Sequence, residues 1–354
     1  MTKERRENTI NWFLISRIFV PSYKTLMQMQ RSKKMKIAII TGGDNAEQEI
    51  SIKSAHTIMD NLDKEKYDAF MIDFHFGKFT DAVTKLPVDL NNFRMEIFDG
   101  IVRFDLVLLF LHGTPAEDGK IQAYLELIDL PYVGCDHFTS ALTFDKQACK
   151  QYLQGLEIPM AKSVLLHKAN PDLEQLKELT GASLFVKPNK NGSSHGISMV
   201  ESTMDYSAAI DKAFEYDDEV IVEEYLKGRE FSNGVYLGPK GIRVLPVTEI
   251  IPHTTFFDYE AKYKNKSDEV TPADLSDVLT LKAQAQSRKL YQALHCKGIV
   301  RFDYILVGED FYFLEVNTIP GFSAESLLPQ QIKVAGLKIG TVLDEVIVET
   351  ISRE

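Results

Sequence analysis

The sequence GIVRFDYILVGEDFYFLEVN, residues 298–317, predicts two antiparallel strands joined by a tight turn. Successive side chains of a strand point to opposite faces, so Arg301 and Asp303 share one face. If the turn is centred on Glu309, Asp303 lies directly opposite Glu315 on the second strand. Two carboxylates that face each other across a strand pair repel. We therefore expect a positively charged partner between them.

The oxygen atoms on this face suggest a divalent cation. The same register places Asn317 opposite Arg301, beside the two carboxylates. Oxygen atoms of Asp, Glu and Asn suit Mg²⁺ or Mn²⁺, with phosphate groups completing the coordination shell. A neighbouring arginine favours phosphate chemistry further. A solvated face with unrelated acids is the alternative.

A second stretch, VKPNKNGSSHG at residues 186–196, lies between two expected strands. Its small, glycine-bounded and hydroxyl-rich composition is typical of loops whose backbone N–H groups bind phosphate. Lys187, at the end of a strand, is placed to reach the same phosphates. The stretch does not match the P-loop pattern, and an ordinary hairpin turn is the alternative.

Residues 220–230, VIVEEYLKGRE, predict an apolar strand that ends in acids and a turn. Such a segment resembles a linker between two lobes. There an acid can accept from an amino group, and the backbone after Tyr225 can hydrogen-bond an adenine edge. Surface acids at the end of a strand are the alternative.

A polar loop is expected over residues 253–276, where Asp258 and Lys262 stand among aromatic residues. A polar loop of this length in a compact domain is usually a lid or disordered. We favour a lid that closes over a charged ligand and excludes water.

The N-terminal part alternates strands with helices. Strands are expected at 36–40, 69–74 and 104–110, with one helix after the first strand and another at 121–128. Strand, glycine turn and helix in succession predict a parallel α/β layer with its site at the carboxyl ends of the strands. Further strands are expected at 162–166, 184–187, 197–200, 220–224, 230–237 and 243–250, and helices at 144–153, at 277–294 and near Leu343.

The composition indicates a folded protein rather than a nucleic-acid or membrane protein. The 354 residues carry a net charge of −11, whereas a nucleic-acid partner would require a basic surface. No apolar run approaches the roughly 18 residues of a membrane span. Cys135, Cys149 and Cys296 form no CxxC pair. We expect buried, reduced thiols in a cytoplasmic protein, with a disulfide or zinc site as the alternative.

Residues 1–34 differ from the rest because they are basic and rich in methionine, and Arg17 interrupts their apolar run. A secretory signal is a poor fit, since the run is short and lacks a small-residue cleavage site. We expect a leader without function, either disordered or preceding a true start at Met35. A docked amphipathic helix is the alternative.

Together these motifs resemble the D-alanine–D-alanine ligase family of the ATP-grasp superfamily, from Met35 onward. No single motif decides the resemblance, but many occur in the family's order. They are Gly42-Gly43 with Glu47 and Ser51; Leu111-His112-Gly113 with Glu117-Asp118-Gly119, Gln122 and Glu126; Pro131-Tyr132-Val133-Gly134; Asp145-Lys146; Val186-Lys187-Pro188 with Gly192-Ser193-Ser194; Tyr259-Glu260-Ala261-Lys262-Tyr263; Pro272-Ala273; Arg301-Phe302-Asp303; and Glu315-Val316-Asn317 with Pro320-Gly321.

The resemblance implies an α/β fold, an ATP-grasp with an N-terminal parallel domain and two α+β lobes that enclose ATP. After the leader, it divides the chain into a Rossmann-like substrate domain at 35–132, a central lobe at 133–226 and a C-terminal lobe at 227–354. The lid loop belongs to the C-terminal lobe.

The resemblance also implies a reaction in two steps. The carboxylate of a first D-alanine attacks the γ-phosphate of ATP to give an acyl phosphate, and the amine of a second D-alanine then displaces phosphate. The product, D-alanyl-D-alanine, serves peptidoglycan precursors. Two Mg²⁺ or Mn²⁺ ions would assist, and the family suggests a homodimer.

By the same resemblance, the nucleotide site and the metal site fall on residues of the motifs above. Lys146, Lys187 and backbone amides around Ser194 would bind the phosphates; Glu223, the Leu226 backbone and Glu230 the adenosine; and Asp303, Glu315 and Asn317 the two metal ions, with Glu315 bridging.

The substrate residues are implied in the same way. Glu47, grouped with Ser193 and Tyr263, would bind the first ammonium near His112; Arg301 and the Gly321 N–H would stabilise the oxyanion; Ser326 and Leu327 would bind the second substrate; and Lys262 would contact the γ-phosphate.

Other functions remain as alternatives. A sister ligase that joins D-alanine to D-lactate or D-serine is the nearest, although Tyr263 after Lys262 favours the dipeptide over the ester. Another ATP-grasp carboxylate–amine ligase, or an ATP-binding regulatory protein with a degenerate site, is more distant.

Overall fold

The computed structural model describes residues 34–179, 183–192, 195–201, 206–253 and 267–353. The predictions for the leader, for Ser193 and Ser194, and for Lys262 and Tyr263 on the lid therefore lie outside the described residues. Met35–Glu354 form one unit. None of the described helices is long and apolar enough to cross a membrane.

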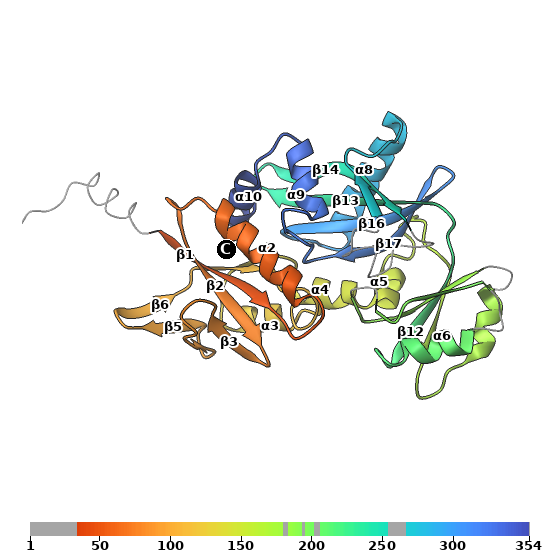
Figure 1. The fold of residues 1–354 in the computed structure, drawn as a ribbon. Coiled ribbons are helices and arrows are strands. Elements are labelled where there is room, and N and C mark those ends of the chain that lie inside the picture. The colour runs from red at the N-terminus through yellow and green to blue at the C-terminus, as the bar shows by residue number, and fades with distance from the viewer. Residues whose placement is uncertain (1–33, 180–182, 193–194, 202–205, 254–266, 354) are drawn as a thin grey trace, which may run out of the picture. The chain divides into compact units, whose positions relative to one another are not determined.

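The first sheet has the strand order β3-β2-β1-β7-β8 (Figure 1). The three predicted strands are confirmed as β1 (Met35–Gly42), β2 (Tyr67–His75) and β7 (Leu106–Leu109). They pair in parallel, and β8 (Tyr132–Val133) adds to β7 in the same sense. β1 is buried along most of its length because its apolar residues pack on both faces of the sheet.

Helices α2 (Gln48–Asn61) and α3 (Lys120–Leu127) follow β1 and β7, as the pattern predicts. The sequence reading missed an antiparallel segment between β2 and β7. It comprises β3 (Lys78–Asp81), which pairs with β2, and a small sheet of β4 (Val88–Asp89), β5 (Arg94–Ile97) and β6 (Gly100–Arg103).

The second sheet is antiparallel, with the order β11-β10-β12-β9. Its strands are those predicted for the middle of the chain. One face packs against helix α6 (Tyr206–Ala213) and the 3₁₀ helix η2 (Leu173–Leu179), around an apolar cluster of their side chains. The strands are β9 (Ser163–His167), β10 (Leu184–Pro188), β11 (Ser198–Val200) and β12 (Glu219–Glu224).

The third sheet has the order β15-β14-β13-β16-β17, also antiparallel. Its core side packs against α8 (Asp277–Ala293), which Ser276 caps by accepting a hydrogen bond from the Leu279 N–H. Strand β15 (Ser267–Val270) corrects the prediction of a continuous loop from 253 to 276. The other strands are β13 (Arg229–Gly238), β14 (Gly241–Pro252), β16 (Ile299–Val307) and β17 (Asp310–Asn317).

One predicted helix, at 144–153, is wrong in its bounds. The chain forms two helices here, α4 (His137–Phe144) and α5 (Lys146–Tyr152), which meet at Asp145. Asp145 takes an extended conformation and accepts a hydrogen bond from the Ala148 N–H at 2.8 Å, which starts the second helix. Because of this break, α5 begins with Lys146.

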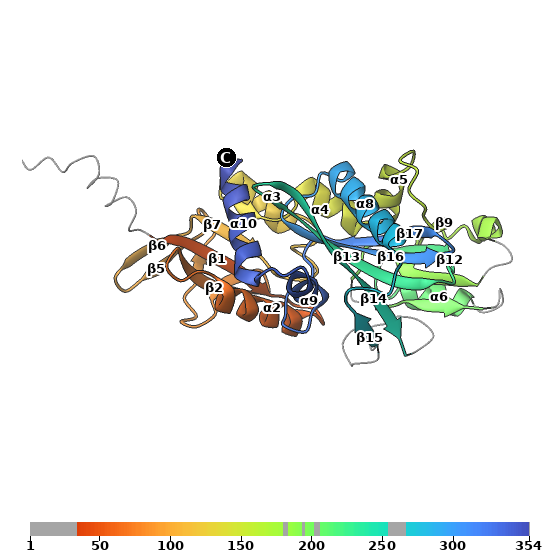
Figure 2. The same ribbon diagram turned by 90° about the horizontal axis from the view of Figure 1, so that it is seen from above.

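Two C-terminal helices, α9 (Leu327–Val334) and α10 (Ile339–Ser352), return to the N-terminal part of the chain. Figures 1 and 2 show α10 beside α2, and their apolar side chains join one core cluster with β1. The last residues of the chain therefore stabilise the first sheet.

The β16–β17 hairpin has a different turn from the one predicted. A two-residue turn, Gly308-Glu309, joins the strands, so that Val307 pairs with Asp310. With a regular register from this turn, Glu315 would share the face of Phe311, which is buried in the core.

A β-bulge at Leu314 corrects the register. It inserts one unpaired residue into β17, and beyond it Asp303 pairs with Glu315 and Arg301 with Asn317. The predicted cross-strand pairs are therefore confirmed, although the bulge rather than the turn creates them. The bulge turns both polar residues of β17 away from the core.

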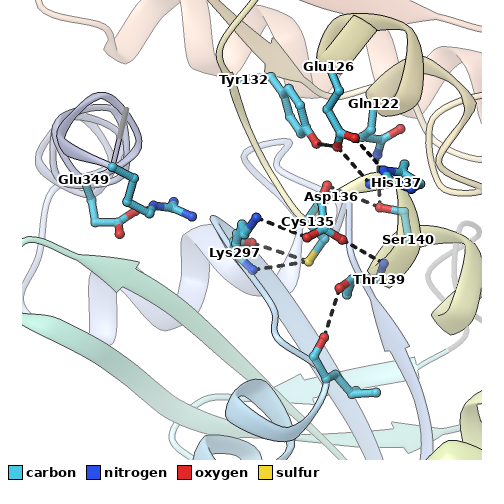
Figure 3. A network of polar contacts seen from close by, with 12 residues as sticks. Gln122, Glu126, Tyr132, Cys135, Asp136, His137, Thr139, Ser140, Lys297 and Glu349 are labelled. Atoms are coloured by element: carbon cyan, nitrogen blue, oxygen red, sulfur yellow. Dashed lines mark hydrogen bonds and ion pairs between the residues drawn. The ribbon is translucent and has the colours of Figure 1, made fainter. Parts of the chain in front are cut away.

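The segment that connects β8 to α4 packs closely against the residues that precede β16. Gly298 has φ +62, and a Cβ there would lie 2.8 Å from the backbone nitrogen of Gly134. Figure 3 shows Lys297 beside Asp136, to which its Nζ pairs at 3.1 Å, and beside Cys135, whose thiol accepts from the Lys297 N–H at 3.5 Å. This backbone contact fixes the start of the strand that carries Arg301.

All three cysteines are buried and free, as the sequence predicts. Cys135, Cys149 and Cys296 belong to the same core cluster, under the third sheet. Burial raises the pKa of the Cys149 thiol to about 12, so it stays protonated at neutral pH.

A matched pair of glycine substitutions tests the close contact between Gly298 and Gly134. Gly298 and Gly308 both have φ +62, but a Cβ on Gly308 meets no atom within 4 Å. Gly308→Ala should cost about 1–2 kcal/mol of unfolding free energy through backbone strain alone. Gly298→Ala should cost about 1–3 kcal/mol more, because its methyl group overlaps the Gly134 backbone. Urea unfolding measures both, and equal losses would contradict the close contact.

Candidate active site

A cavity of about 1050 Å³ lies among the three sheets. It is walled by the loops after β1 and β7, by α5, by the facing strands of the second and third sheets, and by the start of α9. Every sequence-predicted site residue that the structure describes lines it: Glu47, His112, Lys146, Lys187, Glu223, Leu226, Glu230, Arg301, Asp303, Glu315, Asn317, Gly321, Ser326 and Leu327.

The loops after β1 and β7 are tied together by side-chain hydrogen bonds. Asn45 donates to the His112 carbonyl at 2.8 Å, and its own amide oxygen accepts from the Glu47 N–H at 2.8 Å. Ser51 on α2 accepts from the His112 N–H at 3.0 Å. These bonds hold Glu47 and His112 at one end of the cavity.

His112 is a neutral imidazole in this site. Burial lowers its pKa, and the Glu47 charge only partly opposes this effect. Its Nε2 atom is buried and has no hydrogen-bond partner among the described residues. A polar ligand in the cavity would provide that partner, since unpaired buried polar atoms are costly.

Glu117 is a site residue to which the sequence reading gave no role. It lies beside Glu47, and both carboxyl groups lie close to Gly192. Burial, and then the charge of Glu47, raise the pKa of Glu117 to about 8 although the Gly113 N–H donates to it at 3.2 Å. Glu117 is therefore largely protonated at pH 7.

Glu223 lies between two buried lysines. Lys187 contacts one carboxylate oxygen at 2.6 Å and Lys150 the other at 2.5 Å. Burial alone would raise the pKa of Glu223, but the charges of Lys187 and Lys150 lower it to about 2. Lys150 also donates to the Ala161 carbonyl at 2.7 Å. The sequence reading missed Lys150, although it stands one helical turn after Lys146.

Lys146, at the start of α5, lies beside the hairpin acid Glu315. Its Nζ donates to the Asn191 carbonyl at 2.8 Å and lies 3.9 Å from a Glu315 oxygen. The charge of Glu315 also acts on Lys187. It helps to raise the pKa of Lys187, which burial alone would lower. Two lysines thus face the carboxylate of β17, and both line the cavity.

Arg301 and Asp303 form a two-point ion pair on β16. Arg301 Nε donates to Asp303 Oδ1 at 2.9 Å and Nη2 to Oδ2 at 2.7 Å. Ser232 on the neighbouring strand donates to the same carboxylate at 2.7 Å, and Asn317 at 3.0 Å. Both oxygens of Asp303 are therefore fully hydrogen-bonded by the protein itself.

The hairpin residues fit a divalent cation by their chemistry. Asp303 and Glu315 face each other across the strands, and Asn317 adds an amide that can present its oxygen after a flip. Among the described residues, no three His, Cys, Asp or Glu side chains form a metal-binding group. A cation here therefore needs oxygen atoms from Asn317 and from its ligand.

A further wall of the cavity is built from the loop after β17 and the start of α9. Ser54 on α2 accepts from the Phe322 N–H at 3.0 Å, which anchors this loop to the first sheet. Ser323 and Ser326 share a hydrogen bond at 2.8 Å. A Cβ on Gly321 would lie 3.0 Å from Ser326 Oγ, so these two residues are neighbours.

Gln331 secures α9 to the third sheet. Its amide accepts from the Gly234 N–H at 2.8 Å and donates to the Ser232 carbonyl at 3.0 Å. Gly234 admits no side chain, because a Cβ would lie 2.3 Å from Leu328. The helix start that carries Ser326 and Leu327 is thus held directly against the strand beside β16.

The segment between β12 and β13 closes the remaining wall. Leu226 lies in this connection, and Glu230 follows on β13 opposite Ile305. Arg229 pairs with Glu249 through two hydrogen bonds of 2.7 Å and holds the start of β13 to β14. This wall presents both apolar and charged side chains to the cavity, with Leu226 and Glu230 among them.

Comparisons with known proteins find similarity along most of the chain. Family models described as the D-ala D-ala ligase N-terminus and C-terminus match residues 36–135 and 152–348. The D-alanine–D-alanine ligase of Flavobacterium johnsoniae is 44% identical over 307 residues, which cover 86% of this chain and 95% of the relative.

Two solved structures are similar along most of the chain. The VanG D-Ala:D-Ser ligase from Enterococcus faecalis has a TM-score of 0.81 at 33% identity, covering 89% of this chain and 99% of that one. The D-alanine–D-alanine ligase from Bacillus anthracis complexed with ATP has a TM-score of 0.72 at 29% identity, covering 90% and 97%. The predicted α/β ATP-grasp fold is confirmed by these likenesses.

Glu117 predicts a pH dependence of stability. Its pKa is about 8 in the folded protein, against roughly 4.3 in an unfolded chain. The folded state therefore binds the extra proton between these values, and stability falls as the pH rises through them. Glu117→Gln keeps the Gly113 hydrogen bond without the titration. Its Tm should match the wild type near pH 4 and exceed it by several degrees near pH 8.5; a gap independent of pH would contradict this prediction.

Proposed function

Because the chain belongs to the D-alanine–D-alanine ligase family, we propose that it joins two D-alanines in an ATP-dependent reaction that supplies peptidoglycan precursors. The observation that carries the proposal is the single cavity that gathers all the described residues expected for nucleotide, metal and both amino acids. We place the reaction in the cytoplasm, in a homodimer. We retain the three domains inferred above, at 35–132, 133–226 and 227–354.

The nucleotide lies between the second and third sheets. Lys146 and Lys187 bind the phosphates of ATP, with backbone amides around Ser194. Lys187 exchanges part of its pairing with Glu223 for the phosphate, and Lys150 keeps the Glu223 carboxylate charged and in place. Glu223, the Leu226 backbone and Glu230 bind the adenosine.

The hairpin supplies the metal ligands. Asp303, Glu315 and Asn317 would hold two Mg²⁺ or Mn²⁺, which would offset the charge of the phosphates when bound. When Asp303 binds a metal ion instead of Arg301, the Arg301 guanidinium becomes available to a ligand. The exchange keeps every buried charge paired.

The first D-alanine binds at the end of the cavity near α2. Glu47 receives its ammonium group, together with Ser193 and Tyr263, and the neutral His112 lies beside it. The substrate carboxylate then faces the γ-phosphate and attacks it to give the acyl phosphate. Lys262 on the lid contacts the same phosphate, and the closed lid keeps water from the acyl phosphate.

The second D-alanine binds near the start of α9. Ser326 and Leu327 receive it, and its ammonium group loses a proton to water before the resulting free amine attacks the acyl carbon. Arg301 and the Gly321 N–H stabilise the oxyanion of the tetrahedral intermediate. Collapse of that intermediate breaks the bond to phosphate and leaves the dipeptide.

A D-alanine–D-serine ligase is the second candidate. The observation that favours it is the likeness to the VanG D-Ala:D-Ser ligase at 33% identity along 89% of this chain. The two activities share every step and differ only in the second substrate. A competition between D-alanine and D-serine therefore decides between them.

The activity is tested by ADP release from the purified full chain with Mg-ATP. D-Alanine alone, D-alanine with D-serine, D-alanine with D-lactate, and L-alanine are compared, and the products are identified by mass. Turnover with D-alanine alone, giving the dipeptide, is the expected result. A dominant mixed product would assign the chain to a sister ligase, and no product in a chain that binds ATP would refute the proposed substrates.

Glu315→Gln tests the metal site within this assay. The substitution removes the charge that lies between the two cations and should lower kcat by roughly a thousandfold or more, while the Tm changes by a few degrees at most. Glu309→Gln, at the turn of the same hairpin, is the matched control and should retain full activity. Retained activity in Glu315→Gln would refute the metal assignment.

A further inference from the structure

Glu269 lines the cavity but has no role in the chemistry described so far. It lies on β15, the edge strand that pairs with β14, opposite Ile250. Its neighbour Asp268 pairs instead with His253 at 3.1 Å. The two acids of this short strand therefore have different surroundings, and only Glu269 is partly buried.

The carboxylate of Glu269 reaches the first turns of α9. Gln330 Nε2 donates to its Oε2 at 2.6 Å and also to the Glu325 carbonyl at 3.1 Å. Gln330 stands one helical turn after Ser326, whose carbonyl accepts from its backbone N–H at 3.4 Å. Glu269 thus lies beside the part of the helix proposed to bind the second substrate.

The charges around Glu269 allow its carboxylate to bind a cation. Burial raises the pKa of Glu269, while the Gln330 hydrogen bond and the Arg301 charge oppose the shift. Gln330 is neutral, so its hydrogen bond leaves the charge uncompensated. Among the described residues, Arg301 is the charged group whose field reaches Glu269, and it is already paired with Asp303. A small cationic group beside Glu269 would be stabilised.

We propose that Glu269 binds the ammonium group of the second amino acid, an inference that rests on the proposed function. Ser326 at the start of α9 receives the carboxylate, and Arg301 with Gly321 marks the position of the acyl carbon. An α-amino acid carries its ammonium and carboxylate on one carbon. Its nitrogen must therefore lie close to these groups. Glu269 lines the same cavity and is joined through Gln330 to the residue before Ser326, which makes it an acid of this region.

The same contact selects the class of nucleophile. A D-amino acid arrives with a positive ammonium group, whereas a D-hydroxy acid such as D-lactate presents a neutral hydroxyl. Carboxylate binding favours the first by a charge-assisted hydrogen bond that the second lacks. Glu269 is therefore a specificity residue that directs the ligase toward an amide rather than an ester.

Glu269→Gln is the decisive variant, because it removes the charge but keeps the volume and the hydrogen bond from Gln330. The KM for the second D-alanine should rise by about 10- to 100-fold, as expected for the loss of one charged hydrogen bond. The KM values for ATP and for the first D-alanine should stay within about twofold. With D-alanine and D-lactate in competition, the ester share of the product should rise by about tenfold.

Two matched variants separate recognition from a structural role. Asp268→Asn removes the neighbouring charge and should leave both KM values and the product ratio unchanged. Gln330→Leu removes the hydrogen bond but keeps the Glu269 carboxylate, so the preference for D-alanine over D-lactate should persist. If Glu269 only anchors β15 to α9, Gln330→Leu will impair the enzyme as much as Glu269→Gln does, with no change in product ratio in either.

The outcomes separate this inference from the proposed function. An active wild type whose Glu269→Gln variant keeps its KM for the second D-alanine and its product ratio overturns the inference alone. A folded wild type that forms no amide with a D-amino acid overturns the proposed function and the inference with it. The Tm of each variant, measured with and without Mg-ADP, shows whether the fold and the nucleotide site survive.

Discussion

The β-bulge at Leu314 is the constraint on which the site depends. Strands alternate their side chains strictly, so β17 can bury Phe311 and Phe313 in the core and still present Glu315 and Asn317 to the cavity only if one residue is inserted between them. The inserted residue itself joins the cavity wall. A single irregularity thus lets one strand serve both the core and the site.

The buried acids of the cavity are not all neutralised in the same way. Glu223 is paired twice by lysines, whereas Glu117 remains protonated because Glu47 is near and water is excluded. Like charges at close range are unfavourable in a low dielectric, and the fold offsets this by pairing or protonation. An ammonium group and a metal–phosphate complex would replace these internal pairs. Ligand binding therefore exchanges partners rather than burying new charge.

Two serine hydroxyl groups of α2 fix the loops that form the site. Ser51 holds His112 and Ser54 holds Phe322, so two loops that are distant in sequence are anchored on one helix. Helix α10 covers the same region and joins its core cluster. The first and last parts of the chain consequently position both loops at the cavity.

The sequence by itself determined most of the strands, the parallel first layer and the polar face of the hairpin, because these follow from local periodicity. It did not indicate the short strands β3 to β6 or β15. It also marked Lys187 and Arg301, since they stand at strand positions with a fixed direction. Only the tertiary structure decided the bulge at Leu314, the pairing of Lys150 with Glu223, and the contact of Glu269 with Gln330, which are 61 residues apart. Such contacts depend on how separate elements pack, and no local sequence pattern shows which distant residues will meet.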